Sequence, residues 1–138
     1  MTRSSRTPRH LVVDGETFLW SVRHEHQEHR EHGCGRLYDD CREVLTVRRP
    51  GALGVARIVF AGGPGRFVPD GGATPSGAVG TRRGPWLNLH EPGTVRALLD
   101  ALLSRGGLTC RDRTDEVDGW TLYEAAAVGE RSAGTLPG

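Results

Sequence analysis

The sequence predicts an α+β fold: an antiparallel sheet of four to six strands, with one amphipathic helix from the C-terminal half packed on one face. Two observations lead to this class. Segments rich in β-branched and aromatic residues alternate with turn sequences in the first half of the chain, as in hairpins. A later segment, Pro92 to Arg105, has apolar residues at helical spacing. Strands first and a helix late are typical of α+β proteins rather than of alternating α/β proteins.

A first hairpin is predicted over residues 10–24. Two apolar segments, 10–13 and 17–24, flank the pair Asp14-Gly15. A type I′ turn needs a positive φ at both central residues, and Asp-Gly is one of the pairs that adopt it most readily. Alternate residues of the second segment are large and apolar, which predicts one buried face made by Phe18, Trp20 and Val22.

A second hairpin is predicted from Arg42 to Ala61. Residues 42–48 and 55–61 read as strands, and the connection between them contains Pro50 and Gly51 at turn positions. Sequential strands tend to be neighbours in a sheet. We therefore expect the two hairpins to form a four-stranded antiparallel meander.

The predicted helix has one apolar stripe. Pro92 fits the first helical position, where its missing N–H is not needed, and Gly106-Gly107 fits the end. The stripe repeats at helical spacing and consists of Val95, Leu98, Leu99, Leu102 and Leu103. Short strands are predicted at 86–89 and, as the last element, at 120–124.

One domain is predicted over residues 10–124, with tails at 1–9 and 125–138. The length of 138 residues suits one domain. Two polar insertions are expected within it, at 25–40 and 62–85. The second is rich in glycine and proline, a composition that forms no long regular element. Phe67 and Val68 are expected to dock it to the rest of the chain.

The composition favours a cytoplasmic protein that has no membrane partner. No apolar run approaches the ~20 residues of a membrane-spanning helix, and no signal-peptide pattern follows the first residues. The three cysteines, Cys34, Cys41 and Cys110, are too few and uneven for a disulfide framework. A Cys34–Cys41 bridge stays open on spacing.

All 18 basic residues are arginine, a bias that is typical of GC-rich genomes. They are balanced by 17 acidic residues, and the formal net charge is +1. A nucleic-acid-binding domain usually carries a clear basic excess or stripe. The sequence therefore argues against a nucleic-acid partner.

Residues 24–41 contain the most unusual pattern, Glu-His-X three times in succession. The interleaved Glu and Arg favour a solvated variable loop. Because histidine and cysteine are the usual zinc ligands, a metal site is the alternative, although the spacing matches no established zinc motif. Its candidate ligands are His24, His26, His29, His32, Cys34 and Cys41. With this segment aside, no cofactor is expected.

No catalytic motif is present: the sequence has neither a phosphate-binding loop with Lys-Ser/Thr nor a nucleophile elbow. The cluster Arg82, Arg83 and Trp86 combines cationic and aromatic side chains that suit partner binding. We therefore expect a small non-enzymatic binding or accessory module with an unknown protein partner. A homodimer through the sheet is a further expectation. A zinc-binding protein and a small enzyme are the alternatives.

Overall fold

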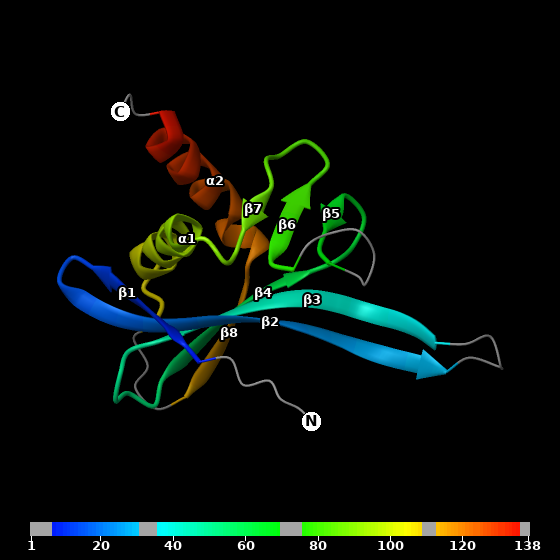
Figure 1. The fold of residues 1–138 in the computed structure, drawn as a ribbon, viewed down its shortest axis with the longest axis horizontal. Helices are drawn as coiled ribbons and strands as arrows, with labels where there is room; N and C mark the ends of the chain where they lie inside the picture. Colours follow the sequence, from blue (N-terminus) through cyan, green and yellow to red (C-terminus); the bar gives the residue numbers. More distant parts are fainter. Residues whose placement is uncertain (1–6, 31–35, 70–75, 109–112, 136–138) are drawn as a thin grey trace.

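The computed structural model describes residues 7–30, 36–69, 76–108 and 113–135, and for 26–30, 36–40 and 129–135 it describes the backbone course. The described chain is mixed, with sheet predominating (Figure 1). It forms a five-stranded sheet, a smaller three-stranded sheet and two helices. The predicted combination of sheet and helix is therefore confirmed, whereas the prediction of a single helix is wrong.

The larger sheet has the strand order β1-β2-β3-β4-β8. The bounds of its strands are Arg9–Val13 for β1, Glu16–Arg30 for β2, Arg36–Arg48 for β3, Val55–Ala61 for β4 and Thr114–Asp118 for β8. From β1 to β4 the neighbours are antiparallel, so the predicted meander is confirmed. β8 pairs parallel with β4, so the sheet is mixed rather than antiparallel. Parallel neighbours need a crossover connection, and here the crossover contains a helix.

The turn between β1 and β2 has the predicted form. Asp14 has a φ of 52° and Gly15 a φ of 81°, both in the left-handed region. Val13 pairs with Glu16 directly beside this turn. The Asp-Gly pair therefore sets the register in which Phe18 and Trp20 face the core.

The predicted polar insertion at 25–40 is wrong for its described residues, because β2 continues to Arg30 and β3 begins at Arg36. Ladder pairing extends from the body of the sheet to Arg30↔Arg36, with a shift in register between Glu25 and Gln27. In a two-stranded ribbon the main chain satisfies its own hydrogen bonds while both faces can meet water. Polar composition alone therefore does not prevent these strands. The expected tail at 1–9 is also too long, since Arg9 begins β1.

The first helix, α1 (Pro92–Ser104), follows the prediction closely and has Pro92 at its first position. The second helix, α2 (Trp120–Thr135), replaces the predicted strand at 120–124 and most of the predicted tail at 125–138. Asp118 Oδ1 accepts the N–H of Trp120 at 3.0 Å and so begins the helix. Ala126 and Ala127 then extend the buried face of Leu122 and Tyr123 at helical spacing.

A small sheet lies on the same side of the larger sheet as the two helices (Figure 1). Its order is β5-β6-β7, with β5 at Arg66–Phe67, β6 at Ala78–Thr81 and β7 at Leu87–Asn88. The predicted insertion at 62–85 thus contains two short strands. β7 lies within the strand predicted at 86–89.

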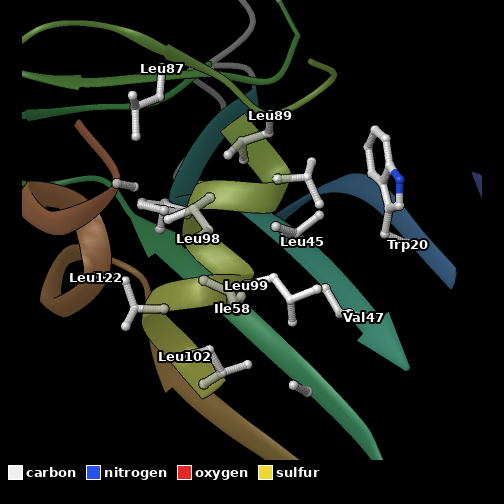
Figure 2. Packing of buried hydrophobic residues seen from close by; sticks show 14 of the residues in the cluster. Trp20, Leu45, Val47, Ile58, Leu87, Leu89, Leu98, Leu99, Leu102 and Leu122 are labelled. Carbon is white, nitrogen blue, oxygen red and sulfur yellow. The ribbon is translucent and has the colours of Figure 1, made fainter. Parts of the chain in front are cut away.

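The core lies between the larger sheet and α1, and α2 closes one side of it. Figure 2 shows Leu98, Leu99 and Leu102 of α1 directed toward residues of β3 and β4. These partners are Leu45, Val47 and Ile58, and all three are buried. Leu122 of α2 belongs to the same cluster.

The opposite face of the larger sheet carries arginine and glutamate side chains that pair across neighbouring strands. Arg57 forms two hydrogen bonds with the carboxylate of Glu25, at 3.0 and 3.1 Å, and a third with Glu116 at 3.3 Å. Arg42 also pairs with Glu25. Val44 lies on this face and is fully buried. Long arginine stems can cover apolar surface while their charged ends meet water, which accounts for a buried valine on a face that no described helix covers (Figure 1).

Replacement of Leu98 by alanine should destabilise the protein by about 2–5 kcal/mol, because it leaves a cavity between α1 and the sheet. Leu98 is completely buried, whereas Leu53, in the turn between β3 and β4, is 76% exposed. Leu53→Ala is therefore the matched control and should change the free energy of unfolding by less than about 0.5 kcal/mol. Urea unfolding of the two variants measures the difference, and equal losses would contradict the packing.

The Glu25–Arg57 pair should make stability pH-dependent. Hydrogen bonding from Arg57 is the largest cause that holds the pKa of Glu25 below its ordinary value of 4.5. A lowered folded-state pKa stabilises the fold fully above pH 4.5, and this contribution is lost as the pH falls through the folded-state value. Glu25→Gln should therefore flatten the loss of stability in acid. Glu124→Gln, at an exposed position of α2, is the control and should leave the loss of stability in acid unchanged.

Candidate functional site

The histidine-rich segment is only partly within the described residues. His24 lies on β2 and Cys41 on β3, with side chains described. The side chains of His26 and His29 lie outside that description, as do His32 and Cys34 entirely. The backbone is extended from Glu16 through Arg30, so His24, His26 and His29 lie on one strand. No group of three or more His, Cys, Asp or Glu suited to a metal occurs among the described residues. The zinc site stays a prediction, and elemental analysis of the purified protein tests it.

His24 instead takes part in a polar link across the core. Its Nδ1 lies 2.6 Å from Oε1 of Glu43, whose side chain is completely buried. The other carboxylate oxygen, Oε2, accepts the N–H of Gly77 at 2.8 Å. Glu43 therefore ties the chain just before β6 to the larger sheet. Buried carboxylates need such partners, because desolvation of an unpaired charge is costly.

His90 is held beside this link, directly before α1. The ring Nε2 of His90 lies 3.1 Å from Oγ of Ser76. The backbone N–H of His90 donates to the side-chain oxygen of Asn88. Its carbonyl accepts a hydrogen bond from Arg9 at 2.9 Å. These contacts fix the connection between β7 and α1 and thus the position of the small sheet.

Two aromatic rings are exposed on the small sheet. Phe67 on β5 and Trp86, just before β7, stack with ring centroids 6.0 Å apart and planes at 22°. Phe67 is 40% exposed and Trp86 is 52% exposed. A Cβ at position 80 would lie 2.8 Å from the Trp86 ring, so the indole rests against the backbone of Gly80. The glycine lets the ring lie flat on the sheet while its outer face meets solvent.

Two arginines lie in the turn that connects β6 to Trp86. Arg82 and Arg83 are exposed and lie in the turn that follows β6. The turn is fixed by the N–H of Gly84, which donates to Oγ1 of Thr81 at 2.9 Å, and by Tyr123 of α2, which donates to the carbonyl of Pro85. We call Phe67, Arg82, Arg83 and Trp86 the aromatic–arginine surface. Arg82, Arg83 and Trp86 are the residues that the sequence predicted for partner binding, and Phe67 contacts Trp86 in the structure.

A hollow of about 230 Å³ lies where β4 and β8 end. Since these strands are parallel, their carboxyl ends meet at one edge of the sheet, a common place for ligands in sheets with parallel strands. The hollow is lined by Val59, Ala61, Arg66, Glu116, Val117, Asp118 and Trp120. The sequence did not predict this hollow, because Trp120 was expected on a strand and β8 was not expected.

Comparisons with family models, with curated proteins and with solved structures find no match to this chain. Among the described residues, no helix has the length and apolar character to cross a membrane.

Loss of the Glu43 carboxylate should destabilise the fold. Glu43→Ala removes the acceptor of the Gly77 N–H and the partner of His24, at a cost of about 2 kcal/mol or more. Glu43→Gln keeps one acceptor oxygen and should therefore lose less stability than Glu43→Ala. Thermal unfolding ranks the two variants, and hydrogen exchange at Gly77 should accelerate most in Glu43→Ala. Unchanged exchange there would show that the link does not hold β6.

Proposed function

We propose that the protein is a non-enzymatic binding module that contacts an acidic, partly apolar segment of another protein through the aromatic–arginine surface. The observation that supports this most strongly is the stacked pair of Phe67 and Trp86, because both rings remain substantially exposed. Adjacent exposed aromatic rings are characteristic of interaction surfaces, whereas single exposed apolar residues are ordinary.

The rings are already ordered for binding. Trp86 rests against the backbone of Gly80 and contacts the ring of Phe67, and Tyr123 donates a hydrogen bond to the carbonyl of the preceding Pro85. An ordered side chain loses little rotamer freedom when a partner covers it. Tryptophan and arginine are also the residues that most often dominate binding energies. The surface therefore has the properties of a binding centre rather than of a flexible loop.

Charge favours an acidic partner. Neither Arg82 nor Arg83 forms an ion pair with another residue in the described ranges, and both are exposed. Two unneutralised guanidinium groups beside an apolar patch complement carboxylates beside an apolar side chain. Complementary charges would accelerate association and fix orientation, while burial of the rings would supply most of the affinity.

A protein segment suits the chain better than a nucleic acid does. Aromatic rings with arginines also bind single strands by stacking, but such proteins normally carry a basic groove that follows the backbone. Here the formal net charge is only +1, and acidic Glu116 and Asp118 line the nearby hollow. The homodimer and the zinc-binding alternative stay predictions, with no contact in the described residues that favours either over the surface.

Selection from a displayed library of acidic and apolar peptides, followed by fluorescence anisotropy with the selected peptide, tests the proposal. Trp86→Ala should weaken binding about tenfold or more. The double change Arg82→Gln and Arg83→Gln alters only exposed side chains. It should weaken binding and reduce its salt dependence.

Leu53→Ser is the control, since Leu53 is exposed in the turn between β3 and β4 and outside this surface. It should bind the peptide as the unmodified chain does. Equal selection from a library with lysine in place of the acids would contradict the proposal. Tighter binding of oligothymidine at the same residues would also overturn it, in favour of a nucleic-acid partner.

A further inference from the structure

The hollow at the ends of β4 and β8 brings together Arg66 and the carboxylate of Asp118, with Glu116, which is paired with Arg57, beside them. Arg66 lies on one side with its guanidinium carbon 5.5 Å from the centre of the Trp120 ring. Glu116 and Asp118 also line the hollow. Within the described ranges, Arg66 forms no ion pair with either carboxylate. The remaining lining is apolar, with Val59, Ala61 and Val117.

Neighbouring residues hold these groups in place. Asp118 uses Oδ1 to accept the N–H of Trp120, and Glu116 receives a hydrogen bond from Arg57 at 3.3 Å. The Trp120 indole donates to the carbonyl of Ala61 at 2.8 Å, and its ring packs edge-on against Phe60. Because Trp120 is itself fixed, the guanidinium that lies over its ring has a defined place to rest.

Separated opposite charges beside an apolar wall complement a molecule that carries both charges and an apolar group. We propose that the hollow binds a free α-amino acid with an aliphatic side chain. Its carboxylate would meet Arg66, its ammonium group would meet Asp118, and its side chain would contact the valines. A volume of about 230 Å³ is below the usual range for drug-sized ligands and suits a small metabolite.

This site is independent of the aromatic–arginine surface. Arg66 and Phe67 are consecutive residues of β5, so their side chains leave opposite faces of the small sheet. Arg66 contacts Trp120, whereas Phe67 contacts Trp86. A ligand in the hollow therefore needs neither ring of the surface, and each proposal can fail without the other.

Titration of the ¹⁵N-labelled full chain with L-leucine tests the site. We expect saturable shifts of the Trp120 indole N–H and the Gly119 amide. N-acetyl-leucine lacks the ammonium group and leucinamide lacks the carboxylate. Each should bind about tenfold more weakly or worse, since a charge-assisted hydrogen bond is lost. Absence of saturable shifts with leucine, or equal binding of all three compounds, would overturn the proposal.

Two substitutions locate the binding groups without loss of the fold. Asp118→Asn removes the charge but keeps a side-chain oxygen for the N–H of Trp120. Arg66→Met keeps an apolar stem at an exposed position. Both should weaken leucine binding about tenfold or more. Trp86→Ala is the control and should leave it unchanged. Unaltered binding in both Asp118→Asn and Arg66→Met would place the ligand elsewhere and overturn the assignment.

Discussion

Burial of the apolar stripe of α1 against β3 and β4 is the contact on which the rest of the structure depends. The larger sheet has one strongly apolar face, and the two helices and the small sheet all lie on that side (Figure 1). With α1 fixed between Leu45, Ile58 and Leu122, the chain on either side of the helix is fixed as well (Figure 2). The preceding chain carries the small sheet, and the following chain returns as β8 and α2.

Both candidate sites follow from this arrangement. The aromatic–arginine surface is presented by a small sheet that has little core of its own, so buried Glu43 and the α2 residue Tyr123 hold it in position. The hollow arises where β8 joins β4 in parallel and α2 begins directly afterwards. Contacts between distant parts of the chain, rather than local sequence, bring Arg66 to Trp120 and Asp118.

Local patterns predicted the elements whose signals lie within a few residues. The Asp14-Gly15 turn, the four antiparallel strands and the helix that begins at Pro92 all have such signals. The prediction failed at 120–124, because Trp-Thr-Leu-Tyr alternates like a strand, although Ala126 and Ala127 continue the buried helical face of Leu122 and Tyr123. It also failed at 25–40, because polar composition was taken as a loop. Of the surface residues, Arg82, Arg83 and Trp86 were predicted for partner binding from their residue types, whereas Phe67 was expected only to dock its loop.

The sequence by itself determined the first hairpin, the meander and the amphipathic character of α1, because turn chemistry and apolar periodicity act over short distances. Only the tertiary structure decided that β8 lies parallel to β4, that α2 is a helix and that Trp86 stacks on Phe67. Those outcomes depend on which apolar faces remain to be covered once α1 has packed. Packing between segments that are far apart in the chain settles these outcomes, so a local sequence pattern does not predict them.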